Sequence, residues 1–274
     1  MQTKTKSTLT VLTECSIMIA LATVLSIIKL FELPYGGSIT VASMLPLVII
    51  SYRHGTGVGL GAALAASALQ LLLGLNNLSY FTTWYSILAI ILLDYIVAFT
   101  VFGLSGIFRS KTENQSASML TGALIASVLR YICHVISGAT VWAGLSIPTG
   151  AALAYSFGYN ATYMIPETVV LLLAVFYVGS SLDLTKRIPM PIVRKKLNTG
   201  ATLLVIVAGF VALGALAADT VLVFSKLQNA DSGEFMITGL ADVNWVAVII
   251  VTLAAAVVTS ALALVARMLS KKEN

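Results

Sequence analysis

The stretch Arg130-Tyr-Ile-Cys-His134-Val-Ile-Ser-Gly138-Ala-Thr-Val-Trp142 lies inside an apolar run that extends from about residue 117 to residue 145. On an α-helix, Arg130, His134, Gly138 and Trp142 follow one another at intervals of four, so they share one broad face. Ionisable groups within membrane-spanning segments usually face the protein interior or a cavity, and they mark candidate functional sites. The stretch therefore predicts either a polar seam that joins helices through hydrogen bonds or one wall of a binding pocket.

The composition of the 274-residue chain is that of an integral membrane protein. Hydrophobic residues make up 58% of it and charged residues 10%, whereas soluble domains carry about 25% charged residues. A water-soluble core could not hide this much apolar sequence. Cys15 and Cys133 both lie in apolar runs, so we interpret them as small buried hydrophobic residues and expect no disulfide.

Eight apolar segments predict an all-α membrane protein. They lie at about residues 9–30, 39–53, 55–75, 82–108, 117–145, 152–180, 201–224 and 243–268. The second segment is short for a span of about 20 residues, so we expect it to be tilted or to be broken near Pro46. We predict a six-helix transmembrane bundle at 1–184, a basic cytoplasmic linker at 185–200, and a two-helix transmembrane hairpin of unassigned role at 201–274.

The basic residues predict the orientation of the chain in the membrane. With the N-terminus inside, Lys29 and Lys226 fall outside, Arg130 lies within a span, and the remaining lysines and arginines fall on the cytoplasmic side. This positive-inside bias predicts that both termini are cytoplasmic. The basic cluster at 186–196 is therefore interpreted as a feature of topology and lipid headgroup contact, and no nucleic-acid partner is expected.

Three charged residues within the predicted spans should lie at similar depth. Asp94, Arg130 and Glu167 are comparable numbers of residues from the outer ends of their helices, which at about 1.5 Å per residue places them near the midplane. An unpaired charge at that depth is costly, so a buried ion-pair network is expected. If Arg130 pairs mainly with Glu167, Asp94 is left to face a cation.

Aromatic and polar side chains in the outer halves of three predicted helices could converge on one outward-facing pocket, although helical phase alone leaves this open. The interfacial aromatic belt suits Trp84, but His134 and Asn160 would each need a buried hydrogen-bond partner. Aromatic faces attract a cation, a carboxylate pairs with a positive charge, and an amide can hydrogen-bond to the edge of a ring. The pocket would suit a flat, cationic, nitrogen-rich ligand. Its candidate residues are Trp84, Asp94, His134, Gly138, Trp142, Tyr155 and Asn160.

The connection Glu32-Leu-Pro-Tyr35-Gly-Gly-Ser-Ile-Thr40 is predicted to lie outside, above this pocket. Its proline and two glycines indicate a shaped loop, which is either an ordinary tight turn or a lid with Tyr35 reaching into the pocket. On the first helix, Ser16 and Ala20 are small residues four apart. Such spacing allows another helix to approach closely, either inside the bundle or from another membrane subunit.

The sequence contains no motif that indicates an enzyme. Residues 55–61 carry four alternating glycines, but no strand precedes them and no lysine follows, so close helix packing is the better interpretation. Metalloprotease, nucleophile-elbow and aspartate-rich metal motifs are absent from the sequence. We therefore expect no catalytic residues, no metal and no cofactor, and no ATPase site in this chain.

Several stretches over about residues 8–180 form a specific combination. They are residues 9–22, Pro34 to Thr40, Ser51-Tyr-Arg-His-Gly55, Asp94 to Phe99, Leu129 to His134 with Ser137, Gly138 and Trp142, and Tyr155 with Tyr159 and Asn160. In this combination the chain resembles the thiamine-specific substrate-binding (S) subunits of energy-coupling-factor (ECF) vitamin transporters. The predicted helices after residue 201 are absent from the six-helix pattern of that family.

The resemblance implies that the chain binds thiamine from outside, in a pocket lined by the candidate residues and covered by the first outer loop. The family's acidic position is commonly Glu, and Asp94 is one methylene shorter. A Trp in the outer loop of some members has no Trp counterpart here, and Tyr35 takes its place. The resemblance further implies a bacterial cell membrane, a membrane coupling subunit that docks at Ser16 and Ala20, and two cytoplasmic ABC-type ATPases.

Two other classes of function remain open on the residues themselves. A self-sufficient secondary transporter for a small cationic or heteroaromatic solute would use Glu14, Asp94 or Glu167 as a proton site. A purely structural or assembly protein of the membrane would bind no ligand.

Overall fold

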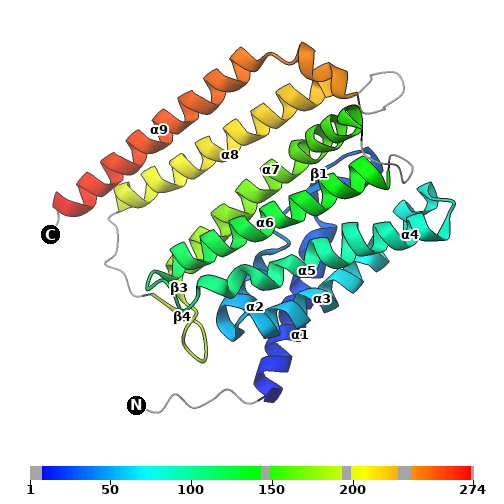
Figure 1. The fold of residues 1–274 in the computed structure, drawn as a ribbon. Coiled ribbons are helices and arrows are strands. Elements are labelled where there is room, and N and C mark those ends of the chain that lie inside the picture. The colour runs from blue at the N-terminus through cyan, green and yellow to red at the C-terminus, as the bar shows by residue number, and fades with distance from the viewer. Residues whose placement is uncertain (1–7, 143–148, 193–198, 228–235, 273–274) are drawn as a thin grey trace. The chain divides into compact units, whose positions relative to one another are not determined.

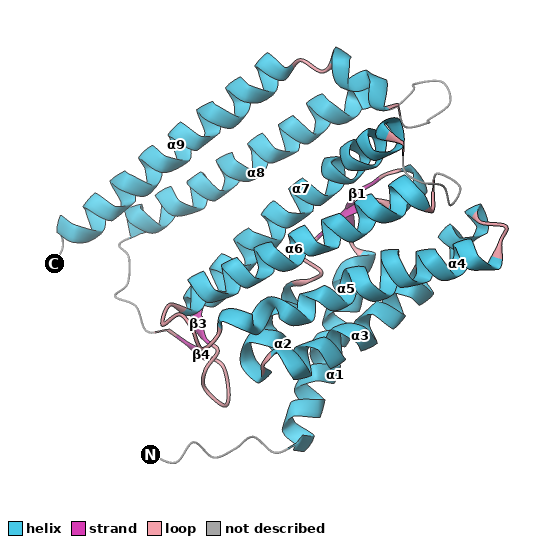
Figure 2. Cartoon of the chain, viewed as in Figure 1, coloured by secondary structure: helices cyan, strands magenta, loops and turns pink. Residues whose placement is uncertain are grey.

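The computed structural model describes residues 8–142, 149–192, 199–227 and 236–272. It divides the chain into two compact units, Met1–Ile192 and Val193–Asn274, which are treated separately below. The described residues are nearly all helical, which confirms the predicted all-α class (Figures 1 and 2). Cys15 and Cys133 are both free, as the sequence indicates.

Seven helices in the described part of the chain are long and apolar enough to cross a membrane. They are Thr8–Ile27, Thr56–Leu73, Trp84–Phe108, Gln115–Thr140, Gly150–Ser181, Thr199–Leu227 and Trp245–Ser270. The second predicted segment forms α2 (Leu45–His54), which has 10 residues. At about 1.5 Å per residue this helix is near 15 Å long, about half of a bilayer core. The described part of the chain thus contains seven helices that are long enough to span a membrane and one short buried helix, where eight apolar segments were predicted.

The remaining elements of the first unit are short pieces that join or interrupt these helices. In chain order the unit contains α1 (Thr8–Ile27), β1 (Lys29–Glu32), η1 (Pro34–Gly36), β2 (Ser38–Thr40), α2, α3 (Thr56–Leu73), η2 (Leu75–Tyr80), α4 (Trp84–Ile90), η3 (Ile91–Val97), α5 (Ala98–Thr100), η4 (Val101–Phe108), α6 (Gln115–Thr140), α7 (Gly150–Ser181), β3 (Leu182–Asp183) and β4 (Met190–Pro191). Of these, η3 is a π-helix, which is the wider helix type often found at functional sites.

The short helix α2 lies in the core of the first unit. Residues 46–53 are all buried, and α2 packs against α1, α3, η4 and α6. Pro46 does not break the helix, because it sits in the first turn, where a missing N–H has no intrahelical partner to lose. A helix enclosed on all sides by other helices can be apolar all round without spanning the bilayer.

Close packing of backbones accounts for part of the glycine-rich stretch at 55–61. A Cβ on Gly59 would lie 2.7 Å from the carbonyl oxygen of Gly103, and a Cβ on Gly106 would lie 2.1 Å from the carbonyl oxygen of Ser51. The Ser51 hydroxyl donates to the Gly103 carbonyl at 2.5 Å and accepts from the Gly106 amide at 2.8 Å. Small residues therefore bring α2, α3 and η4 together, as the sequence predicted.

The connection between α1 and α2 is a two-stranded antiparallel hairpin. Strand β1 pairs with β2, and Phe31 lies opposite Ile39. Tyr35, at the tip, has φ of 66° and is followed by Gly36 with φ of 94°. Left-handed backbone at a tyrosine is uncommon, and it marks the tight turn at the tip of this hairpin.

A second, shorter hairpin follows α7 and includes the first residues of the predicted linker. Strands β3 and β4 pair through Leu182 with Pro191 and Asp183 with Met190. The buried guanidinium of Arg53 donates to the carbonyls of Leu184 at 2.7 Å and of residues 186 and 187 at 3.2 Å. Hydrogen bonds from Thr185 lower the pKa of Asp183. Residues 193–198 of the predicted linker lie outside the described residues.

Helices α8 (Thr199–Leu227) and α9 (Trp245–Lys272) make up most of the second unit and pack side by side (Figure 1). The short helix η5 (Ile237–Asp242) precedes α9. Between the two long helices, the Thr252 hydroxyl donates to Asp219 Oδ2 at 2.7 Å. Residues 228–235, between α8 and η5, lie outside the described part of the chain.

Candidate binding cavity

A cavity of about 820 Å³ lies in the first unit, among the β1–β2 hairpin, the end of α3, η3, α6 and α7. Its size is within the range of small-molecule sites. Seven of the residues selected from the sequence line it: Tyr35, Asp94, His134, Gly138, Trp142, Tyr155 and Asn160. The structure therefore brings together the polar face of α6 and the polar residues of the neighbouring helices.

Asp94 lies in the π-helix η3 and is held by three hydrogen-bond donors from the α6 region. His134 Nδ1 is 2.8 Å from its Oδ1, and the Ser137 hydroxyl and Trp142 Nε1 donate to its Oδ2 at 2.8 Å and 3.1 Å. An ionised carboxylate only accepts and has about four lone-pair positions. This arrangement suits an ionised Asp94 that keeps a negative charge beside the cavity and can accept one further hydrogen bond.

The partners of His134 determine its tautomer. Arg130 Nε donates to His134 Nε2 at 3.3 Å. Arginine nitrogens have no acceptor capacity, so His134 Nε2 must supply a lone pair. The proton of the neutral imidazole is then on Nδ1 and is donated to Asp94. His134 consequently adds no charge to the cavity and orients the carboxylate.

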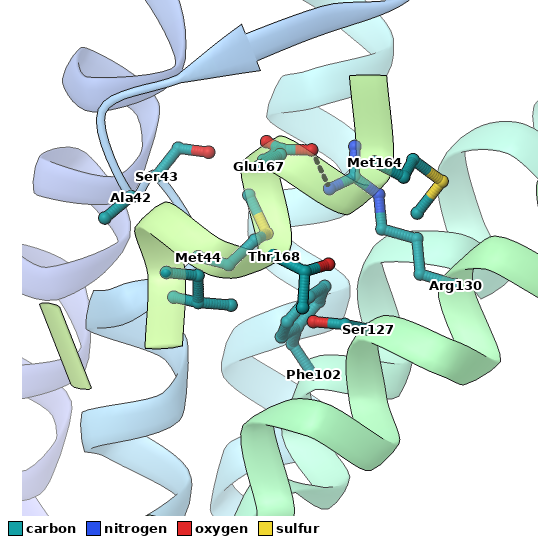
Figure 3. A pocket seen from close by; sticks show the side chains of 10 residues that line it. Ala42, Ser43, Met44, Phe102, Ser127, Arg130, Met164, Glu167 and Thr168 are labelled. Carbon is teal, nitrogen blue, oxygen red and sulfur yellow. Dashed lines mark hydrogen bonds and ion pairs between the residues drawn. The ribbon is translucent and has the colours of Figure 1, made fainter. Parts of the chain in front are cut away.

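Arg130 and Glu167 form a buried ion pair at the inner end of the cavity. Arg130 Nη1 lies 2.9 Å from Glu167 Oε2, and the two side chains are 10% and 7% exposed. Figure 3 shows the two groups pointing toward each other, with Ser127 and Thr168 nearby. The Thr40 hydroxyl, from β2, donates to Glu167 Oε1 at 3.0 Å, and the Arg130 guanidinium lies 4.5 Å from the Phe99 ring centroid. The expected pairing of Arg130 with Glu167 is present.

Trp142 lies at the centre of an aromatic wall. The ring centroids of Phe81, Tyr80 and Tyr35 are 4.8 Å, 5.7 Å and 6.0 Å from that of Trp142. Tyr35 also meets Tyr80 edge to face at 5.7 Å. The hairpin tip is thus joined to the wall through the ring of Tyr35.

The cavity face of α7 is rich in tyrosine. Tyr155 and Tyr159 are stacked, with centroids 6.4 Å apart and rings 5° from parallel. The backbone amide of Gly37 donates to the Tyr159 hydroxyl at 3.2 Å, which attaches the β1–β2 hairpin to α7. Asn160 accepts from Tyr163 at 2.8 Å and donates to the Ser156 carbonyl at 2.9 Å. Both ends of this amide therefore have partners inside the protein.

Gly138 allows α6 and α7 to approach each other. A Cβ at this position would lie 2.2 Å from the Ser156 hydroxyl oxygen. That hydroxyl donates to the carbonyl of Val135 on α6 at 2.9 Å. The glycine lines the cavity and also fixes the distance between its two walls.

Among the residues that the sequence suggested for the pocket, Trp84 does not line the cavity. It is the first residue of α4, it is 74% exposed, and its ring contacts Tyr85 at 5.8 Å. The place beside Trp142 is taken by Tyr80 and Phe81, from the segment just before α4. The aromatic residues at 80–85 indicate in the sequence that this segment contributes rings to the wall. Helical phase does not show which of these rings lie beside Trp142.

The small residues of α1 fall into two groups. Ala22 and Ser26 are buried in the first unit, and Ser26 accepts a hydrogen bond from Gln70 at 2.9 Å. Ser16 and Ala20 are exposed. The stripe at 16 and 20 is therefore not used for packing within the unit.

These features define a multi-pass cell-membrane protein with a polar and aromatic cavity suited to a small organic cation. Residues 12–186 match the family described as "Thiamine transporter protein (Thia_YuaJ)", and the chain belongs to that family. The match covers the unit that contains the cavity and ends before α8.

One curated relative supports this assignment, and one solved structure shares the fold. The chain is 38% identical over 171 residues to "Thiamine transporter ThiT" of Bacillus subtilis (strain 168), an alignment that covers 58% of this chain and 84% of the relative. A solved structure of ThiT from Listeria monocytogenes superposes with a TM-score of 0.51 at 24% identity, covering 62% of this chain and 93% of the other. The second comparison shows that the fold is shared.

Proposed function

We propose that the chain is the thiamine-binding subunit of an ECF-type importer, which captures thiamine from outside and delivers it through an ATP-driven coupling module. The observation that carries this proposal is Asp94, a carboxylate held by three donors beside an aromatic wall. Membership of the thiamine transporter family supports the same ligand.

The charges around the cavity complement a single positive charge. Arg130 and Glu167 cancel each other as an ion pair, and the Nδ1–H tautomer of His134 is neutral. Asp94 is left with one uncompensated negative charge, which matches the thiazolium cation of thiamine. The aromatic wall offers faces that attract such a cation by about 0.5–2 kcal/mol each.

The proposed arrangement follows the sequence-based predictions. Six helices of the first unit, with α2 counted among them, carry the substrate site, both termini are cytoplasmic, and α8 and α9 are an added hairpin. A membrane coupling subunit docks on the exposed Ser16 and Ala20, and two ABC-type ATPases supply the energy. The chain itself acts as a transporter subunit and not as an enzyme.

Thiamine binding by the purified protein tests the proposal. We expect thiamine to quench tryptophan fluorescence, because Trp142 is part of the cavity wall. Trp142→Phe should remove most of the quenching, and Trp84→Phe should leave it, because Trp84 lies outside the lining. Calorimetry that detects riboflavin or biotin but no thiamine would reject the assignment.

The alternative function is a self-sufficient proton-coupled transporter. It requires a carboxylate that takes up and releases a proton in every cycle. Glu14 is bound to Arg53 and lies 2.9 Å from His54, Glu167 is bound to Arg130, and Asp94 is bound to His134. Breaking a buried ion pair is costly, so pairing with arginine disfavours Glu14 and Glu167 as proton sites. Asp94, whose imidazole partner is neutral, is the carboxylate that this function would have to use. Uptake that needs no ATPase and stops with a protonophore would establish the alternative.

A further inference from the structure

The proposed cation site contains a positive group that competes with the ligand. Arg130 lines the same cavity as Asp94. Its Nε is already 3.3 Å from His134, whose other ring nitrogen is 2.8 Å from Asp94. Guanidinium groups bind carboxylates through two parallel hydrogen bonds more readily than most cations do. Something must keep Arg130 from neutralising the carboxylate on which a cationic ligand depends.

Glu167 provides that restraint. It binds Arg130 Nη1 at 2.9 Å through Oε2, while its Oε1 accepts from the Thr40 hydroxyl at 3.0 Å. Thr40 is in turn 2.7 Å from the Ser43 hydroxyl. Both carboxylate oxygens are therefore engaged, and the carboxylate is fixed between α6 and β2. The ion pair thus directs Nη1 of the guanidinium toward α7.

We propose that Glu167 is a positioning residue that determines the specificity of the cavity for cations, because it holds Arg130 away from Asp94 and cancels its charge. This inference rests on the proposed function and assigns Glu167 a role without contact to the ligand. The arrangement also explains why a costly buried pair lies at the cavity wall. Buried ion pairs add little stability compared with well-packed apolar residues, so a pair placed here serves the charge of the site.

Glu167→Gln is the first variant that tests the inference. The glutamine keeps the shape and can still accept from Thr40, but it leaves Arg130 with an uncompensated charge. Arg130 then turns to Asp94, and the net charge beside the cavity falls from −1 to zero. We expect thiamine affinity to fall by about tenfold or more. A neutral isostere of thiamine, with thiophene in place of thiazolium, should lose less than about threefold, because its binding does not depend on that charge.

The double variant Arg130→Gln/Glu167→Gln separates positioning from structure. It removes both members of the pair and restores the charge of −1 from Asp94 alone. We expect thiamine affinity to return to within about threefold of the parent. A purely structural role predicts that the double variant binds no better than Glu167→Gln, or that thiamine and its isostere lose affinity equally. Either result would overturn the inference.

The matched control is Glu14→Gln. Glu14 is also a carboxylate paired with a buried arginine, Arg53, but it does not line the cavity. Its loss should leave the ratio of thiamine to isostere affinity unchanged, and an equal change in that ratio would overturn the inference. If Glu167→Gln does not fold, the double variant is sufficient as a test. Weak thiamine binding by the folded double variant would then reject the positioning role of Glu167. Parent protein that binds no thiamine rejects instead the proposed function.

Discussion

The two units of the chain differ in how many partners the carboxylates within their helices have. In the first unit, the carboxylates of Glu14, Asp94 and Glu167 each meet a basic or imidazole group. In α8 of the second unit, Asp219 receives the Thr252 hydroxyl on one oxygen, and its other oxygen is buried without a partner among the described residues. Networks of hydrogen-bonded polar and charged groups within a membrane protein are characteristic of a functional site, and they occur in the unit that matches the transporter family.

The difference indicates where function has shaped the sequence. The family match ends at residue 186, before α8 begins. The polar residues of the first unit are satisfied by one another and converge on a cavity. The long helices α8 and α9 of the second unit are nearly continuously apolar, with one carboxylate and no comparable network among their described residues. The predictions below test whether binding and coupling belong to the first unit alone.

The largest expected effect is on uptake. Ala20→Phe puts a large ring on the exposed small-residue stripe of α1, where it should hold a partner helix away. We expect thiamine uptake by cells to be abolished and thiamine binding by the purified variant to be unchanged, since the stripe does not line the cavity.

Ala65→Phe, at an exposed alanine of α3, is the control and should preserve uptake. If Ala20→Phe lowers both binding and uptake, α1 packs inside the bundle through this stripe. If it lowers neither, docking uses another face, and α8 and α9 become the next place to look.

The second expected effect is on affinity. Asp94→Asn removes the charge and gives the donors of His134, Ser137 and Trp142 one acceptor oxygen in place of two. We expect thiamine binding to weaken by about 1.5–3 kcal/mol, the range for hydrogen bonds to charged groups. Isothermal calorimetry measures the change.

The matched control for Asp94→Asn lies in the other unit. Asp219→Asn is the same substitution in α8 and should leave thiamine affinity as it is. An Asp94→Asn protein that binds like the parent would make this carboxylate structural, and the contrast between the two units would lose its main support.

A smaller effect is expected at the hairpin tip. Tyr35→Ala removes the edge-to-face contacts with Tyr80 and Trp142. Aromatic pairs contribute about 0.5–1.5 kcal/mol each beyond the area they bury. We expect thiamine to dissociate several times faster, as measured by stopped-flow fluorescence, with a smaller change in the association rate. Tyr85→Ala, which removes an exposed ring that contacts Trp84 outside the cavity, should change neither rate.

Much of this site could be predicted because helical periodicity is regular. The intervals of four along the predicted helix placed Arg130, His134, Gly138 and Trp142 on one face, and all four line the cavity, although α6 ends two residues before Trp142. Depth along the helices predicted that Arg130 and Glu167 could pair, and they do. These features depend on spacing and charge, which a sequence displays directly.

Other features have no comparable signal in the sequence. The π-helix at Ile91–Val97 changes the angle between successive side chains, so an α-helical projection could not place Asp94 relative to Trp84. The hydrogen bonds of Arg53 to the carbonyls after α7 join segments more than 130 residues apart. Helix α2 is only 10 residues long and is enclosed by other helices. Composition alone does not distinguish such a short buried helix from a membrane-spanning one.

The smallest effect tests the second unit by itself. Thr252→Val removes the hydroxyl that donates to Asp219 Oδ2, so neither oxygen of this carboxylate then has a partner among the described residues. Interhelical hydrogen bonds in membranes are weak, and we expect the pairing of α8 with α9 to lose about 1 kcal/mol. Thr259→Val is the control, because the Thr259 hydroxyl bonds to a carbonyl of its own helix at 2.7 Å. Protease protection of α9 in detergent measures the loss, and thiamine titration should show unchanged affinity for both variants. A lower affinity in Thr252→Val alone would mean that the pair of helices α8 and α9 supports the cavity. The division between a binding unit and an added unit would then no longer hold.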